Sequence, residues 1–271
     1  MIIRYIENMP KRLFVIGDIH GCVEELCYML EYLMSEQKLN QNDIVVFVGD
    51  YIDRGDNSKE VIQCLIEFKE KFTNTVFLKG NHEDMLLSYI TSNRIGIRDS
   101  YLANGGVKTL ESYNKPFERE GYTWEEEQNI IEQHLDFFCS LESAIIIGDY
   151  IIVHAGVNPL LPLDYQVEDD LLWIREDFIC NTHPFDKTVV FGHTPYHNIF
   201  FDLPYKIGID TGLVYGNKLS CVELVNKKVF QIDRGDIFVA STTFEALLKQ
   251  EKEGVRTDEQ IEDHENTTKV S

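Results

Sequence analysis

The sequence predicts an α/β fold in which two β-sheets pack face to face and helices cover their outer surfaces. Three strand–turn–helix units follow one another in the first third of the chain, an order typical of parallel strands. The second half is richer in strands and contains two pairs of apolar runs at hairpin spacing. Parallel units followed by hairpins favour two packed sheets over a single doubly wound sheet.

The three early units each place a short apolar strand before a polar turn and an amphipathic helix. We expect strands at residues 13–16, 44–48 and 75–78, and helices at residues 23–34, 58–68 and 84–90. Ser58 is the expected N-cap of the second helix. Because ligands gather at the carboxyl ends of parallel strands, the polar turns should meet at one edge of the sheet.

A mostly helical insertion is expected at about residues 91–143, where no strand pattern is clear. Thr123 followed by Glu126 is a capping-box signal that predicts a helix through about Leu135. The later strands are expected at residues 143–147, 150–153, 187–191, 219–225 and 228–232. The predicted main domain is 1–235, and residues 236–271 are expected to hold a short helix at 243–252 and an acidic, disordered tail.

Composition limits the partners of this 271-residue chain, which is 44% hydrophobic and carries a formal net charge of −21. The excess of acid argues against nucleic acid or an anionic membrane as a partner. No uncharged run approaches the ~20 residues that span a bilayer, and residues 1–12 lack a signal-peptide core, so a cytoplasmic protein is expected. The six scattered cysteines are interpreted as reduced core residues. The oligomeric state stays open.

Polar side chains at the ends of the predicted strands form the candidate site. Their donors are oxygen and imidazole nitrogen only, from Asp18, His20, Asp50, Asn81, His154 and His193. Six such ligands are too many for one catalytic metal and fit two ions about 3.5–4 Å apart, with Asp50 as the bridging carboxylate. The donor set suits manganese, iron or zinc, and we expect manganese. His134, His183, His197 and His264 are interpreted as structural.

Two divalent ions would leave this cluster positively charged, so a phosphate dianion is the expected guest and Arg54 its clamp. His82 is expected at the rim of the metal pair as the proton donor to the leaving group, with Asp53 orienting its ring. Arg175 is left open between a phosphate ligand and a snorkelling surface residue. Tyr215 is left open between the border of the pocket and core packing.

Five motifs, in this order along the chain, resemble the phosphoprotein phosphatase family of calcineurin-like metallophosphoesterases. They are Gly17-Asp18-Ile19-His20-Gly21, Gly49-Asp50-Tyr51-Ile52-Asp53-Arg54-Gly55, Gly80-Asn81-His82-Glu83, His154-Ala155-Gly156 and Gly192-His193-Thr194. The resemblance spans residues 13 to about 225 and is closest to the compact bacterial and phage serine/threonine phosphatases. It implies a β-sandwich of two mixed sheets flanked by helices, with the helical insertion as a substrate-selecting cap.

The resemblance also implies a role for each site residue. One metal would bind Asp18, His20 and Asp50, and the other Asp50, Asn81, His154 and His193. Arg54 and Arg175, the latter in Trp-x-Arg form, would bind phosphate. Apart from the resemblance, Asn81 and Tyr215 are candidate substrate contacts. Asp53 and His82 would form the acid pair.

The expected activity is hydrolysis of phosphomonoesters by direct attack of a metal-bridging hydroxide. The expected substrates are phosphoserine and phosphothreonine in proteins, with phosphotyrosine and small phosphoesters as further substrates. The alternative in the same branch is symmetrical hydrolysis of diadenosine tetraphosphate to ADP. A more remote alternative is a non-catalytic binding protein on the same fold, whose signature would be lost metal ligands.

Overall fold

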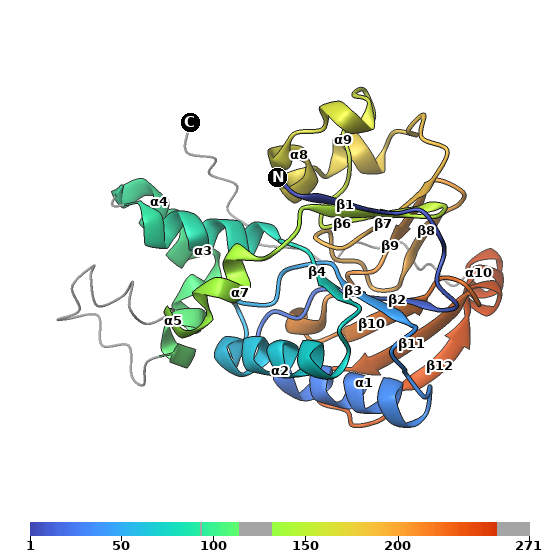
Figure 1. The fold of residues 1–271 in the computed structure, drawn as a ribbon, viewed down its shortest axis with the longest axis horizontal. Coiled ribbons are helices and arrows are strands. Elements are labelled where there is room, and N and C mark those ends of the chain that lie inside the picture. Colours follow the sequence, from blue (N-terminus) through green and yellow to red (C-terminus); the bar gives the residue numbers. More distant parts are fainter. Residues whose placement is uncertain (93, 114–131, 254–271) are drawn as a thin grey trace.

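The computed structural model describes residues 1–92, 94–113 and 132–253 and consists of two mixed six-stranded sheets packed face to face (Figure 1). The first sheet has the order β1 (Ile3–Ile6), β5 (Ala144–Ile147), β6 (Tyr150–Val153), β7 (Thr188–Phe191), β9 (Lys206–Gly208) and β8 (Phe200–Asp202). The second has the order β12 (Ala240–Thr243), β11 (Lys228–Asp233), β10 (Lys218–Glu223), β2 (Leu13–Ile16), β3 (Ile44–Phe47) and β4 (Thr75–Phe77). The predicted fold class is confirmed.

Side-chain alternation along the central strands explains why the molecule is layered. Val15 lies in the core between the two sheets, whereas its neighbour Phe14 lies in the core beneath α1 (Val23–Ser35) and α2 (Ser58–Lys71). The outer face of the first sheet is covered by α8 (Glu168–Trp173) and α9 (Glu176–Ile179) (Figure 1). Each such aliphatic or aromatic side chain contributes about 1.5–3 kcal/mol by leaving water. The central strands β2, β5 and β6 are buried on both faces, whereas the edge strands β1 and β12 are partly exposed.

Strand direction places the polar turns together. β2, β3 and β4 are parallel to one another, and in the other sheet β6 and β7 are parallel. The segments that leave the carboxyl ends of these strands carry the candidate site, as expected for parallel strands. The antiparallel strands β10, β11 and β12 extend the second sheet on its other side.

The described part of the predicted insertion is helical and lies beside the α3 end of the molecule (Figure 1). It comprises α4 (Ile95–Tyr101), a π-helical turn (Leu102–Gly106), α5 (Val107–Tyr113), a 3₁₀ turn (Glu132–His134) and α7 (Leu135–Cys139). The Thr123 capping box lies outside the described residues, as does the tail beyond residue 253. The division into a main domain and a tail stays a prediction.

Several element boundaries differ from the sequence-based expectation. α3 (Asn81–Thr91) begins at Asn81 and not at residue 84, and the last helix is α10 (Phe244–Lys252). The expected N-cap is wrong, because Ser58 is the first residue of α2 and the N-cap position is Asn57. The Ser58 hydroxyl instead accepts a hydrogen bond from the Asp53 amide (3.1 Å). The late hairpin pairs Glu223 with Lys228, so its loop is longer than the two residues expected.

Four strands gave no usable sequence signal: β1, β8, β9 and β12. Three of them are edge strands, whose outer side chains are free to be polar, and β8 and β9 have only three residues each. In β1, Arg4 and Tyr5 are exposed, so the apolar alternation that marks a half-buried strand is missing. Edge position therefore explains most of what the sequence pattern could not reveal.

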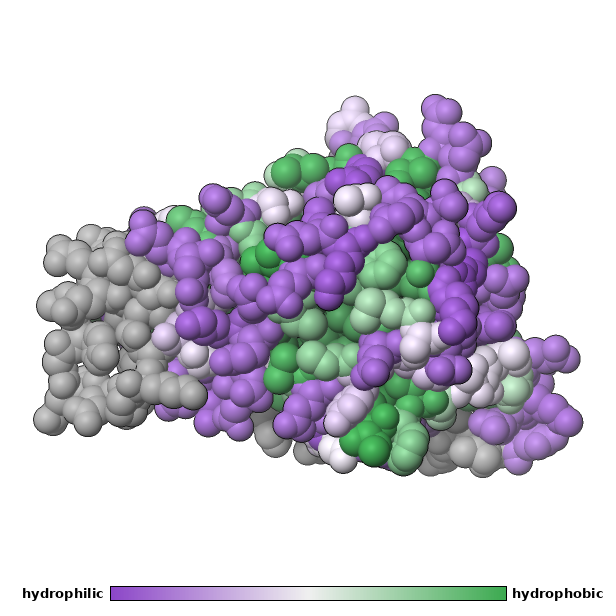
Figure 2. Space-filling view, turned by 60° about the horizontal axis from the view of Figure 1, so that its bottom comes forward, coloured by the Kyte–Doolittle hydropathy of each residue, from purple (hydrophilic) through white to green (hydrophobic). Residues whose placement is uncertain are grey.

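The surface agrees with the acidic, polar composition. Figure 2 shows a face dominated by hydrophilic residues, with apolar residues gathered towards its middle. No helix in the described ranges is both long and apolar enough to cross a membrane. The expectation of core cysteines is only partly right, because Cys22 and Cys221 are buried whereas Cys27, Cys139 and Cys180 are exposed.

Candidate metal centre

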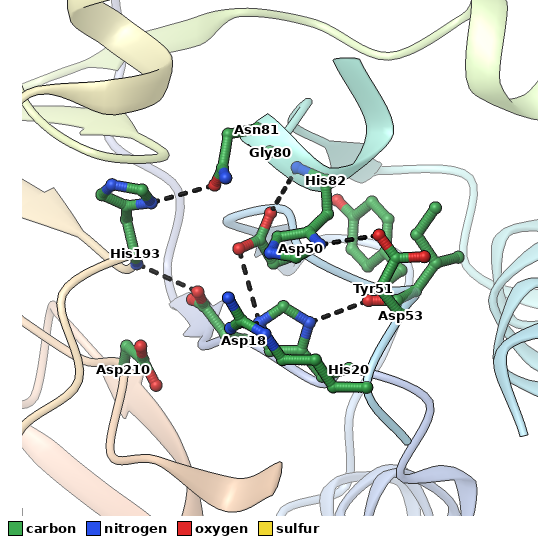
Figure 3. Close-up of polar contacts among 12 residues, drawn as sticks. Asp18, His20, Asp50, Tyr51, Asp53, Gly80, Asn81, His82, His193 and Asp210 are labelled. Atoms are coloured by element: carbon green, nitrogen blue, oxygen red, sulfur yellow. Dashed lines mark hydrogen bonds and ion pairs between the residues drawn. The ribbon is translucent and has the colours of Figure 1, made fainter. Parts of the chain in front are cut away.

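The structure brings all six predicted ligand residues into one buried cluster. Figure 3 labels five of them, Asp18, His20, Asp50, Asn81 and His193. Each comes from the segment after a strand, and none is more than 4% exposed. Asp18 and His20 follow β2, Asp50 follows β3, Asn81 opens α3 after β4, His154 follows β6 and His193 follows β7. Both sheets therefore contribute to the same site.

Asp50 occupies the middle of the cluster. Its Oδ2 lies 3.5 Å from Nε2 of His20, and its Oδ1 lies 3.4 Å from Nε2 of His154. Nδ1 of His20 donates to the Ile52 carbonyl (2.8 Å) and Nδ1 of His154 donates to the Val48 carbonyl (3.0 Å). These backbone contacts fix the ring orientation and turn each Nε2 toward Asp50, as expected for a carboxylate shared between two ligand groups.

Two groups of ligand atoms are close enough to hold a metal ion. Asp50, His154 and His193 form one group, and His20, Asp50 and His82 form the other, with their donor atoms within 4.8 Å of one another. In the first group, Oδ1 of Asn81 lies 2.9 Å from both Nε2 of His154 and Nδ1 of His193. The shared member of the two groups is Asp50, the predicted bridging residue.

The electrostatics of Asp18 test whether these residues fit metal ions. Its Oδ2 accepts the His193 amide (3.0 Å), while its buried Oδ1 has no hydrogen-bond partner among the described residues. Burial, reinforced by the carboxylates of Asp210 and Asp50, raises the pKa of Asp18 well above its usual value. Among the described residues, the Asp18 carboxylate therefore has no positively charged partner to stabilise it. A bound divalent cation would supply that charge.

His20 gives the complementary result. Burial, with a contribution from the nearby Arg54 guanidinium, lowers the pKa of His20 well below its usual value. The imidazole is thus kept in the neutral form that ligates metals. Orphaned carboxylate oxygen and neutral imidazole nitrogen together fit a pair of divalent cations.

Glu83 is a buried residue of this site for which sequence reasoning gave no role. It accepts the amides of Asp50 (2.9 Å), Tyr51 (2.8 Å) and Gly80 (2.9 Å), and so clamps the turn after β3 to the start of α3. Burial, with repulsion from Asp50, raises the pKa of Glu83 to about 8. A Cβ on Gly80 would lie 2.0 Å from Oδ1 of Asp50, so only glycine fits there. The signal was available, since Glu83 stands at the capping-box position of α3.

Backbone strain is concentrated in the site. Five of its residues have positive φ angles, and such conformations cost on the order of 1 kcal/mol or more each. The angles are 46° for His20, 52° for Asp50, 70° for Asp53, 67° for Arg54 and 63° for His193. Clamps such as Glu83 must hold these conformations against the preference of the local sequence.

The contact predicted for the acid pair is formed in the buried interior of the site. Nδ1 of His82 donates to Oδ2 of Asp53 (2.7 Å), and both side chains are fully buried. α3 begins at Asn81, which places His82 in the first helical turn, facing inward. Its ring packs edge-on against His20, with centroids 4.7 Å apart.

Two residues of the helical insertion hold the other oxygen of Asp53. Oδ1 accepts hydrogen bonds from the hydroxyls of Tyr101 (2.9 Å) and Thr109 (2.6 Å). Sequence reasoning missed both, because they lie 48 and 56 residues away along the chain and carry no local motif. The insertion thereby braces the acid pair.

The two arginines lie at opposite histidines of the cluster. Nη1 of Arg54 is 3.0 Å from Nε2 of His20, and Nε of Arg175 donates to Nε2 of His193 (3.1 Å). Arg175 therefore lies beside a predicted ligand, and its role as a phosphate ligand stays a prediction. Tyr215 is 37% exposed with the Arg54 guanidinium 5.5 Å from its ring centroid, so it borders the site and is not a core residue.

Comparison with known proteins identifies the class. The family model described as calcineurin-like phosphoesterase matches residues 11–249, and the chain belongs to that family. The chain is 28% identical to the asymmetrical bis(5'-nucleosyl)-tetraphosphatase PrpE of Oceanobacillus iheyensis, over 83% of this chain and 94% of that protein. It is 31% identical to serine/threonine-protein phosphatase 1 of Salmonella typhimurium, over 79% of this chain and 92% of that protein.

A solved structure supports the fold assignment. The crystal structure of a candidate diadenosine tetraphosphatase has a TM-score of 0.61 and 22% sequence identity, covering 87% of this chain and 99% of that one. The chain is thus a metallophosphoesterase by family, and its relatives include enzymes named for two different substrates.

Proposed function

We propose that this protein is a dimetal phosphatase that hydrolyses phosphomonoesters, with phosphoserine and phosphothreonine in proteins as its main substrates. The observation that carries the proposal is the position of two arginines at the predicted metal ligands. Arg54 is 3.0 Å from His20, a predicted ligand of one ion, and Arg175 is 3.1 Å from His193, a predicted ligand of the other. A phosphate dianion presents several oxygens, which guanidinium groups recognise through paired hydrogen bonds. Phosphotyrosine and small phosphoesters offer the same group.

In this proposal Asp18, His20 and Asp50 hold one divalent ion. The second ion is held by Asp50 together with Asn81, His154 and His193. Oxygen and imidazole donors without thiolate suit Mn²⁺, with iron or zinc as alternatives. When bound, such a pair polarises a phosphoryl group and generates a nucleophile from water near neutral pH.

His82 is proposed to protonate the leaving alkoxide. Because Asp53 accepts from Nδ1 of His82 (2.7 Å), the ring is held with Nε2 as the atom that can deliver a proton. The carboxylate also stabilises the protonated ring, and Tyr101 and Thr109 keep that carboxylate in place. General acid catalysis of this kind contributes about 10²–10⁴-fold.

Asymmetrical hydrolysis of dinucleoside tetraphosphates is the second candidate, favoured by a specific finding. The PrpE relative is named for that activity, and 94% of its length is matched. Asymmetrical cleavage of diadenosine tetraphosphate yields ATP and AMP, whereas the symmetrical cleavage expected from the sequence yields two ADP. The partly exposed Tyr215 beside Arg54 offers an aromatic face on which a base could stack.

A substrate panel with added Mn²⁺, with and without chelator, tests both candidates. Release of inorganic phosphate from phosphoserine and phosphothreonine peptides at higher kcat/KM than turnover of diadenosine tetraphosphate supports the first. Preferential formation of ATP and AMP from the dinucleotide supports the second. In either case turnover should stop with chelator and return with Mn²⁺.

Two arginine variants provide the matched control. Arg175→Lys should lower kcat/KM by about 10–100-fold, the worth of a charge-assisted hydrogen bond. Arg4 lies on β1 and pairs with Glu142, which is not a residue of the site. Arg4→Lys is therefore the control and should leave turnover unchanged. Metal binding without turnover of any phosphoester in Mn²⁺, iron or zinc would overturn the proposal in favour of a binding protein.

A further inference from the structure

Two cysteines face each other across neighbouring helices, away from the metal ligands. Cys27 lies on α1 and Cys64 on α2, and the two helices pack side by side (Figure 1). Their sulfur atoms are 3.9 Å apart, and both thiols are free. Formation of a disulfide, with its S–S bond of about 2.05 Å, would require the sulfurs to approach by about 2 Å.

Cys27 has the properties of an attacking thiol. Its residue is exposed, and the hydrogen bond from Cys64 lowers the pKa of Cys27 to about 7 despite partial burial and three nearby glutamates. The same contact, with burial, raises the pKa of Cys64, so Cys27 is the thiol of the pair that ionises first. By contrast, burial raises the pKa of Cys22 to about 12. Thiolate character and access are the two requirements for thiol–disulfide exchange.

We propose that Cys27 and Cys64 form a reversible disulfide by exchange with a small-molecule disulfide. The Cys27 thiolate attacks one sulfur of the reagent, forms a mixed disulfide and releases one thiolate. That thiolate takes the proton of Cys64, whose thiolate then attacks Sγ of Cys27 and releases the second thiolate. This second thiolate takes up from water the proton that Cys27 lost when it ionised. Two protein thiols are oxidised, and one small disulfide is reduced to two thiols.

The position of the pair gives the crosslink a consequence for the fold. α1 begins directly after the turn that carries His20, and α2 begins four residues after Arg54. The two turns are already joined where the Asn57 amide donates to the Gly21 carbonyl (3.1 Å). A disulfide between the next turns of the same helices would add a covalent tie to this junction. This inference goes beyond the proposed phosphatase function and does not depend on it.

The test uses the full chain and bis(2-hydroxyethyl) disulfide, a neutral reagent chosen because Glu24, Glu31 and Glu67 surround Cys27. After reaction and alkylation, Cys27 and Cys64 of the wild-type protein should both be blocked to alkylation, retain no adduct and appear as a linked Cys27–Cys64 peptide. Reduction should restore both thiols. Oxidation should also raise the melting temperature by several degrees, because the crosslink restricts the unfolded chain.

Two serine variants complete the test. Cys64→Ser should trap the mixed disulfide on Cys27, whereas Cys180→Ser, which removes an exposed cysteine elsewhere, should form the crosslink as wild type does. In the unmutated protein, iodoacetamide at neutral pH should modify Cys27 several-fold faster than Cys139 or Cys180. Stable adducts on both cysteines of the wild-type pair, or no linked peptide, would overturn the inference.

Discussion

The two sheets bring different chemistry to the same cluster. The second sheet delivers both carboxylates, Asp18 after β2 and Asp50 after β3, together with His20 and Asn81. The first sheet delivers only imidazoles, His154 after β6 and His193 after β7. Burial, with repulsion from Asp210 and Asp50, raises the pKa of Asp18, so the carboxylates by themselves are costly to keep charged. Neutral imidazoles by themselves bring no charge to balance a cation. The site exists only because the two sheets pack together.

The two halves are also supported differently. On the second-sheet side, Asp53 of the acid pair is held by Tyr101 and Thr109 from the helical insertion. On the first-sheet side, His193 is contacted by Arg175 and by the ring of Trp173, at a centroid distance of 6.1 Å. Substitutions on the two sides should therefore fail in different ways: through proton transfer on one, and through metal or phosphate binding on the other.

The largest effect is expected where the halves meet. Asp50→Asn removes the shared charge, and kcat/KM should fall by at least about 10³-fold because the electrostatic stabilisation of the whole centre depends on it. Elemental analysis should show less bound metal than in wild type. Asp149→Asn, in the turn between β5 and β6, is the control and should change neither quantity. Undiminished turnover in Asp50→Asn would disprove the bridging role.

A somewhat smaller effect, confined to the second-sheet side, is expected for His82→Asn. It should lower kcat by about 10²–10⁴-fold on an alkyl phosphate, because the alkoxide then leaves unprotonated. The loss should be much smaller on an aryl phosphate, whose leaving group needs no acid. Metal content should stay at the wild-type level. Equal losses on both substrates, or loss of metal, would show that His82 is a ligand and not an acid.

A smaller loss of kcat is expected when a hydrogen bond that holds Asp53 is removed. Tyr101→Phe removes one hydrogen bond to Asp53 and should lower kcat by about 10-fold, the lower end of the range for outer contacts. Tyr113→Phe is a matched control, because its hydroxyl contacts Nδ1 of His134 (2.7 Å) and no site residue. Similar kinetics for the two variants would show that the insertion does not position Asp53.

The smallest effect concerns stability on the first-sheet side. His183 is buried between Phe178 and Phe185, and burial lowers its pKa below 6.5. The unfolded chain therefore takes up a proton first, and the free energy of unfolding should fall as pH drops through about 6.5. Urea unfolding of chelated protein at several pH values measures this slope. His183→Phe should have a shallower slope, and an unchanged slope would exclude His183 as a source of the pH dependence.

Local sequence patterns account for the parts of the fold and of the candidate site that could be predicted from the sequence. The buried strands show continuous apolar runs, and six candidate ligand residues of three types stand after strand ends, so the fold class and the candidate cluster could be predicted from short segments. Residues such as Tyr101 and Thr109 could not be found that way, because their role is set by a contact with Asp53 across about 50 residues of chain. Edge strands such as β1 and β12 were missed for lack of a buried face.

The sequence by itself determined which side chains are available as donors and on which strands they arrive. The packing of distant segments is what places Arg175 and Tyr215 beside the cluster and buries His82. It also holds five site residues in left-handed backbone conformations. The physical reason is that hydrophobic periodicity acts within an element, whereas strain, burial and charge compensation depend on what the rest of the chain places around it.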